Sequence, residues 1–291
     1  MHTLALHNEV WSLTLLPQWG GRIASLKVGE LDVFTPLHAG SFDPLNWPRG
    51  GAYPLLPYSN RLRNARLKHA GLVHALPAHP AARPHTLHGV SHTLTWDVIE
   101  HSATYALLTV DYSGEHWPWP VRFQQRFELH GDGVRLQLSV TNLGHTSMPA
   151  GLGLHPYFQR HPGMTVRFAP ALAWDIDADY LPCGSVRELI EPEPLLLPAD
   201  VAHEVAVYGS RWDGRLQLDY PQGQVLLTAE MPLSHLVVFA PAGAPYLCLE
   251  PVSHLADAFN TPPAQWPEQG TQVLEAGQTL SAALSLTWTP A

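Results

Sequence analysis

The sequence predicts an all-β protein built as a large antiparallel β-sandwich, and three observations support this prediction. First, 28 prolines and 22 glycines are spread along the whole chain, which leaves few windows long enough for a helix. Second, many short segments alternate apolar and polar residues with a period of two. Third, turn residues separate these segments, whereas no strand–helix–strand alternation favours a parallel sheet.

The period-two pattern is clearest at residues 134–140, where valines and leucines alternate with polar side chains. Residues 4–16 predict a hairpin around Asn8 and Glu9, and Gly131-Asp132-Gly133 predicts a second tight turn. Further strands are predicted at 104–112, 122–130, 215–220, 224–230, 235–240 and 280–288.

The length of 291 residues is compatible with a single large β domain over residues 1–291. The proline-rich stretch from Glu188 to Ala199 is too short and too apolar for a domain boundary. We therefore expect it to be a long surface connection.

Composition limits the possible functions. Charged residues make up only 14% of the chain and the formal net charge is -9, which disfavours nucleic acid and anionic membranes as partners. Two cysteines, Cys183 and Cys248, form no disulfide framework, and no zinc-ligand spacing is present. Residues 1–9 lack the pattern of a signal peptide, so we expect a cytoplasmic protein. The net negative charge is more compatible with a neutral polar ligand. The sequence does not indicate the oligomeric state.

The stretch Leu247-Cys248-Leu249-Glu250-Pro251 predicts a buried strand that ends on a carboxylate. In such a strand the two leucines face one way, while Tyr246, Cys248 and Glu250 face the other. At the rim of an apolar sheet, partial desolvation would raise the pKa of Glu250 and suit it to act as a base. The alternative is an acidic residue that ends a strand in solvent.

The segment 151–158 also predicts a strand that places candidate site residues on one face. Gly151, Gly153, His155 and Tyr157 are expected to share one face of a strand, with the glycines leaving room for a ligand beside the imidazole and the phenol. Alternatively, the paired glycines admit a bulky neighbouring side chain.

Three further motifs carry candidate site residues. His88 follows Thr86-Leu87, and Arg61 follows a proline-rich bend and Asn60. Arg61 could instead belong to a solvated basic face, and Asp213 in Trp212-Asp213-Gly214 could lie in an exposed turn.

Together these segments resemble the aldose 1-epimerase (galactose mutarotase) family over most of the chain. The resemblance rests on five motifs in the family's order, at residues 52–62, 87–89, 112–120 with 148–158, 211–214 and 250–260. Two departures are Ala256, where the family often has proline, and Val90 after His88-Gly89.

The resemblance implies a galactose mutarotase-like supersandwich and an isomerase that interconverts the α and β anomers of a free aldohexose. It implies that Glu250 is the general base, His155 the general acid, and His88 a second imidazole near the ring oxygen. Arg61, Asn60 and Asp213 would hold sugar hydroxyls. An aromatic side chain such as Tyr157 or Trp212 is expected beside the apolar face of the sugar.

Anomer interconversion requires one group to remove the proton from the C1 hydroxyl and another to protonate the ring oxygen. A carboxylate and an imidazole suit this work, and no metal or organic cofactor is expected. If Glu250 and His155 lie close, each should favour the charged form of the other, giving an ionised base and a protonated acid at neutral pH.

Three alternatives remain open. A hexose 6-phosphate could be the substrate, with its phosphate held by a cluster of Arg61, Arg63, Arg66 and Lys68. A carbohydrate-binding sandwich without catalysis is the second alternative. The third is a metal-dependent barrel of the cupin kind, with ligands among His85, His88, His92 and Glu250.

Overall fold

The alternating segments form long antiparallel strands, as predicted. The computed structural model describes residues 3–38, 40–46, 48–189, 195–198 and 201–291. Strand β12 (Trp117–His130) buries every second side chain, and after the predicted turn β13 (Gly133–Asn142) pairs with it in continuous register. The predicted hairpin at Asn8 is also confirmed, because β1 (Leu4–His7) pairs with β2 (Trp11–Leu16).

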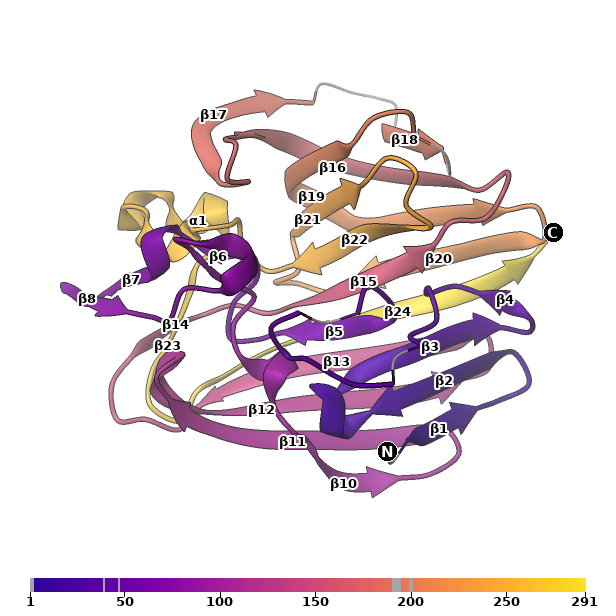
Figure 1. Cartoon of the computed structure of the whole chain (residues 1–291), viewed down its shortest axis with the longest axis horizontal. Helices are drawn as coiled ribbons and strands as arrows, with labels where there is room; N and C mark the ends of the chain where they lie inside the picture. Colours follow the sequence, from indigo (N-terminus) through magenta and orange to yellow (C-terminus); the bar gives the residue numbers. More distant parts are fainter. Residues whose placement is uncertain (1–2, 39, 47, 190–194, 199–200) are drawn as a thin grey trace.

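Within the described residues, one 18-stranded sheet folds over into two layers to give the predicted all-β sandwich (Figure 1). One layer contains β1, β2, β3 (Arg22–Val28), β4 (Leu31–Asp32), β5 (Ala52–Leu55), β15 (Gly153–Gln159), β22 (Tyr246–Val252) and β21 (His235–Ala240). The other contains β10 (Asp97–His101), β11 (Tyr105–Gly114), β12, β13, β24 (Thr279–Pro290) and β20 (Gly223–Ala229).

The two layers are joined by the long strand β19 (Val205–Tyr220). Its first half pairs with β21 and its second half with β20. Strand β16 (Thr165–Ile176) pairs along β19, and β17 (Pro182–Glu188) and β18 (Leu195–Pro198) pair with β16. At the opposite edge His7 N donates to Ala103 O at 2.7 Å, which brings β1 against the β10–β11 connection.

Smaller elements cover one end of the sandwich. The strand pairs are β6 (Arg61–Leu62) with β9 (Thr86–Leu87), β7 (Arg66–His69) with β8 (Leu72–Ala75), and β14 (Met148–Ala150) with β23 (Gln272–Leu274). Helix α1 (Trp266–Gln269) is one turn long, and 3₁₀ turns lie at Pro17–Trp19, Arg63–Ala65, Pro80–Ala82, Ser91–Thr93, Ala258–Asn260 and Pro263–Gln265. Among the described residues no helix has both the length and the apolar character to span a membrane.

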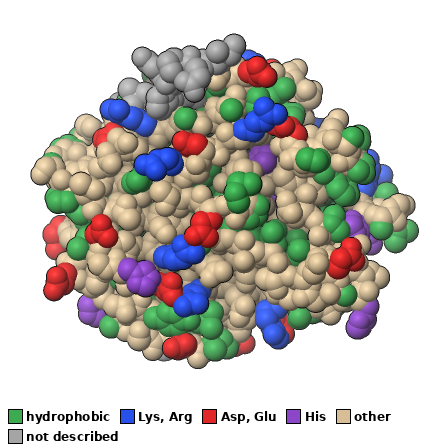
Figure 2. All heavy atoms as spheres, turned by 180° about the vertical axis from the view of Figure 1, so that it is seen from behind, with side chains coloured by type: hydrophobic (Ala, Val, Ile, Leu, Met, Phe, Trp, Pro, Cys, Tyr) green, Lys and Arg blue, Asp and Glu red, His purple; other side chains and the backbone are tan. Residues whose placement is uncertain are grey.

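Strands β5, β15 and β22 are buried on both faces, which is unusual in an antiparallel sheet that covers a core with one face. Leu247 and Leu249 of β22 join the main apolar core. Tyr246 and Cys248 face a second buried cluster on the other side of the sheet. On the molecular face shown in Figure 2, basic and acidic side chains are interspersed.

Two predictions about segment ends are wrong. Strand β22 continues through Pro251 to Val252 instead of ending on Glu250, so the carboxylate lies within the sheet and is 4% exposed. The expected surface connection from Glu188 to Ala199 begins inside β17 and contains β18, because residues 195–198 pair with β16. Residues 190–194 and 199 lie outside the described part of the chain.

The expectation that Gly151 and Gly153 leave space for a ligand is also wrong. A Cβ atom on Gly151 would come within 2.0 Å of the His254 ring, and one on Gly153 within 2.7 Å of the Val252 side chain. The alternative interpretation therefore holds, because both glycines admit neighbouring side chains. The His254 ring has a structural role there, since its Nε2 accepts a hydrogen bond from Ser59 N at 3.1 Å.

We predict that Gly151→Ala lowers the free energy of unfolding by about 1–3 kcal/mol, because the methyl group must displace a buried imidazole. Gly40→Ala is the matched control, since a Cβ at Gly40 meets no atom within 4 Å. Urea unfolding of both variants measures the difference. Equal stability of the two variants would contradict this explanation of Gly151.

Candidate active site

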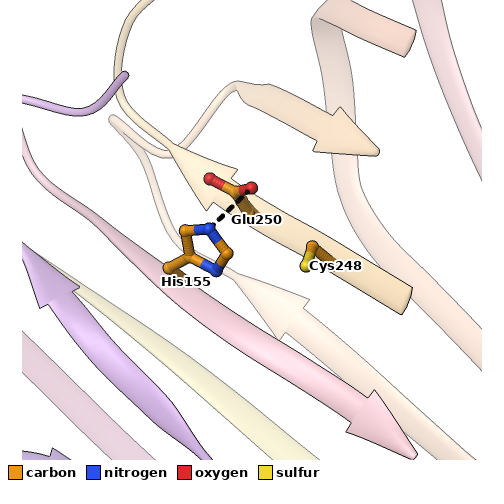
Figure 3. A group of neighbouring side chains, drawn as sticks. All are labelled: His155, Cys248 and Glu250. Atoms are coloured by element: carbon orange, nitrogen blue, oxygen red, sulfur yellow. Dashed lines mark ion pairs between the residues drawn. The ribbon is translucent and has the colours of Figure 1, made fainter. Parts of the chain in front are cut away.

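The second buried cluster contains a carboxyl group and an imidazole from adjacent strands. Glu250 lies on β22 and His155 on β15, and the pairings Gly153 with Val252 and Tyr157 with Cys248 place the two residues opposite each other. His155 Nε2 is 3.4 Å from Glu250 Oε1. Figure 3 shows both side chains on the same side of the sheet, with Cys248 next to Glu250 along β22.

Burial, rather than mutual attraction, dominates the electrostatics of this pair. Desolvation raises the pKa of Glu250 to about 8, although the positive charge of Arg61 opposes the shift. The pKa of His155 is lowered to about 3, mainly by desolvation and also by the positive charges of Arg22 and Arg49. These directions are opposite to the expected ionised Glu250 and protonated His155, because burial favours the neutral form of each group.

A cavity of about 210 Å³ opens beside this pair. His155 and Tyr157 contribute to its wall, and Arg49 and Arg61 add two cations. Its other lining residues are Leu45, Asn46, His79, Ala81, Leu87, Phe239, Tyr246 and Cys248. A small polar ligand in this cavity would contact an imidazole, a phenol and two guanidinium groups.

His88 and Asn60 support this site through the paired strands β6 and β9. Asn60 N donates to His88 Nδ1 at 3.1 Å, and His88 N donates to Asn60 O at 2.8 Å. Because Nδ1 accepts, a neutral His88 carries its proton on Nε2. Its ring centroid lies 5.2 Å from that of His155.

Asn60 contributes to the framework around the cavity. Its side-chain Nδ2 donates to the Tyr208 hydroxyl at 3.0 Å, and its Oδ1 accepts from Arg61 N at 2.8 Å. The backbone of Asn60 has a φ of 59°, in the left-handed region that asparagine tolerates better than most residues. These contacts fix the start of β6 and so direct Arg61 towards the cavity.

Trp212 and Asp213 lie away from the cavity, and their predicted role in sugar binding is wrong. Trp212 belongs to the main core, and its Nε1 donates to Arg215 O at 2.9 Å. Asp213 is exposed, and its Oδ1 accepts from Arg215 N at 2.9 Å. Asp213 is exposed, as the alternative expected, but it lies within strand β19 instead of a turn, and it lines a different pocket.

The basic cluster expected to hold a phosphate does not form. Of its four members only Arg61 lines the cavity. Arg63 lies instead between Asp177 and Asp257, at 3.2 Å and 3.6 Å. Arg49 takes part in the cavity although no sequence motif marked it, and its Nη1 donates to the Tyr246 hydroxyl at 3.1 Å.

The histidines of the cupin alternative do not assemble around Glu250. His85 Nδ1 accepts from Asn64 N at 2.9 Å, away from the pair. Within the described residues, the group with metal-binding potential is His155, Cys248 and Glu250, whose ligand atoms lie within 4.8 Å of one another. Burial raises the pKa of the Cys248 thiol well above its usual value, so a metal ion would have to displace protons from both Cys248 and Glu250. The site as it stands is better suited to proton transfer.

Comparison with known proteins identifies the family of the chain. The sequence matches the model of the aldose 1-epimerase family over residues 3–287. The chain belongs to the aldose 1-epimerase family.

Members of the aldose 1-epimerase family with known structures have the same fold. A candidate aldose 1-epimerase from Escherichia coli K12 superposes with a TM-score of 0.86 at 23% identity, over 100% of this chain and 99% of that one. A galactose 1-epimerase from Lactobacillus acidophilus NCFM gives a TM-score of 0.77 at 14% identity, over 99% of this chain and 94% of that one. The uncharacterized E. coli K12 protein YphB is 27% identical over 220 residues, which cover 72% of this chain and 75% of that protein.

Proposed function

We propose that this protein is an aldose 1-epimerase that interconverts the α and β anomers of a free aldohexose. The observation that carries the proposal is the buried Glu250–His155 pair, 3.4 Å apart beside a cavity lined by arginines and aromatic side chains. Membership of the aldose 1-epimerase family supports the same reaction class.

The pair can hold one proton in two arrangements. In the first, Glu250 is a carboxylate and His155 an imidazolium; in the second, both are neutral. The opposite pKa shifts of the two residues favour the neutral arrangement when no sugar is bound. The hydroxyl groups of a bound sugar would stabilise the charged arrangement by hydrogen bonding to it.

Ring opening uses the charged arrangement. The Glu250 carboxylate accepts the proton of the C1 hydroxyl, the C1–O5 bond breaks as the C1 carbonyl forms, and His155 donates its proton to O5. The pair is then neutral, which is the arrangement that burial favours. We infer that the site favours the state reached after ring opening.

Reclosure on the other face restores the starting state. After rotation about the C1–C2 bond, neutral His155 accepts the proton from the C5 hydroxyl as O5 attacks C1. Glu250 returns its proton to O1, so the number of protons on the pair is unchanged over the whole cycle. Arg61 and the Nε2 proton of His88 are suited to hold sugar oxygens, and Tyr157 to cover the apolar face of the ring.

A sugar that carries an anionic group is a second candidate substrate. Arg49 and Arg61 both line the cavity, while Asp213, which was expected to hold sugar hydroxyls, is on another surface. A phosphate or carboxylate on the sugar could pair with Arg49.

We predict that the protein accelerates mutarotation of freshly dissolved α-anomer, followed by polarimetry, and that Glu250→Gln and His155→Asn each lose about 10²- to 10⁴-fold in kcat. Glu115→Gln, at an exposed carboxylate, is the matched control. Wild-type turnover in Glu250→Gln would refute the catalytic assignment. Sugar binding without acceleration in the wild type would favour a carbohydrate-binding module.

The same assay separates the remaining alternatives. Activity should persist after exhaustive chelation, and a metal-dependent enzyme would lose it. Turnover of glucose is compared with that of glucose 6-phosphate. A strong preference for the phosphate, lost in Arg49→Met, would identify the anionic sugar as the substrate.

We predict that kcat/KM is flat through neutrality and falls above a pH of about 8. Above that pH Glu250 ionises while His155 stays neutral, so the pair loses its only proton. On the acid side kcat/KM declines only near pH 3, where protonation of His155 leaves two protons on the pair. A rate that falls between pH 7 and 5 would contradict this assignment.

A further inference from the structure

The buried side chain of Arg22 lies behind the proposed catalytic pair. Arg22 begins β3 and is 0% exposed. Its guanidinium carbon lies 4.4 Å from the centre of the Tyr53 ring and 5.1 Å from the centre of the Phe42 ring. A buried guanidinium carries a large desolvation cost, so a protein that places one there requires compensating contacts.

Four neighbouring strands align this arginine with the catalytic pair. Strand β3 pairs with β5 at Ile23 and Ala52, β5 pairs with β15 at Tyr53 and His155, and β15 pairs with β22. The residues therefore form one row across the sheet, which runs in the order Arg22, Tyr53, His155, Glu250.

The rings in this row are stacked. The Tyr53 ring lies 4.6 Å from the His155 ring at an interplanar angle of 24°, and His155 lies 4.8 Å from Tyr157 at 25°. The imidazole thus contacts two phenol rings, whose centroids lie 6.4 Å apart, and a positive charge lies behind the Tyr53 ring. Stacking of this kind fixes the plane of the imidazole, while the charge acts through a low-dielectric interior.

We propose that Arg22 is a positioning residue for catalysis, which orients the His155 imidazole through Tyr53 and places a buried positive charge behind that ring pair. This inference rests on the proposed function. The Arg22 charge keeps the Glu250–His155 pair neutral between turnovers, so that His155 is a strong acid whenever it is protonated.

Other charged or titratable groups also surround His155. They come from β22, β6, the segment after β9, the loop before β5, β5 and β15 itself. They are Glu250, Cys248, Arg61, His88, His92, Arg49, Tyr53 and Tyr157. Arg49 is exposed to solvent, whereas Arg22 is enclosed, so the charge of Arg22 is less screened.

Arg22→Met removes the charge with little change in volume, and Arg22→Lys keeps the charge but removes the planar group. We expect the acid limb of kcat/KM to move up by about one pH unit in Arg22→Met and to stay in place in Arg22→Lys. Lower kcat with an unmoved acid limb in Arg22→Met, or the same shift in both variants, would overturn the proposal.

Titration of the His155 imidazole by ¹⁵N nuclear magnetic resonance gives the same comparison without turnover. If the wild type shows no mutarotation, the proposed function fails, while the ¹⁵N titration still tests the effect of Arg22 on His155. If Arg22→Met does not fold, the His155 pKa in Arg22→Lys tests the proposal. A pKa that differs from the wild-type value by one unit or more in this variant would contradict the role of the charge.

Discussion

The removal of one carboxyl group and one imidazole from water is the constraint on which this site depends. Glu250 is 4% and His155 8% exposed, and in such surroundings each group is more stable in its neutral form. A salt bridge would have been the simple expectation for two such residues 3.4 Å apart. Burial penalises the charged form of each group, and Glu250 Oε2 has no hydrogen-bond partner within the described residues.

The fold provides this dry environment by burying both faces of β5, β15 and β22. One face of these strands contributes to the main core between the layers, and the other lies under the segments that contain β6 and β9. A sheet with one wet face would leave Glu250 near its ordinary pKa. The short paired strands and turns at this end of the sandwich thus have a chemical consequence, since they exclude water from the proton-transfer pair.

Much of the fold could be predicted because period-two alternation is a local signal. Strands with one buried face, such as β12 and β13, were found from it, and the turn between them followed from glycine and aspartate. Alternation gives no signal for strands that are buried on both faces. For this reason the sequence predicts that Glu250 lies at the rim of the sheet. The missing signal is also why Gly151 was interpreted as room for a ligand, when the space is filled by His254 from a segment a hundred residues away.

Glu250 and His155 could be predicted as site residues, because each lies in a strand in which period-two alternation shows which side chains share a face. The sequence does not predict the surfaces of Trp212 and Asp213, because these depend on an irregularity in the pairing of β19 with β16. Arg22 and Arg49 carried no sequence signal. Their approach to the pair depends on long-range pairing of β3 with β5 and on a loop, and neither can be deduced from spacing alone.

The most direct measurement of the central claim is the protonation state of the His155 imidazole in the ligand-free protein at pH 7, observed by ¹⁵N nuclear magnetic resonance with a His155→Asn sample to assign the signal. We expect a neutral imidazole that stays neutral as the pH is lowered from 7 to 5. An imidazolium at pH 7 would contradict the account, because it would mean that the attraction to Glu250 outweighs the cost of burial.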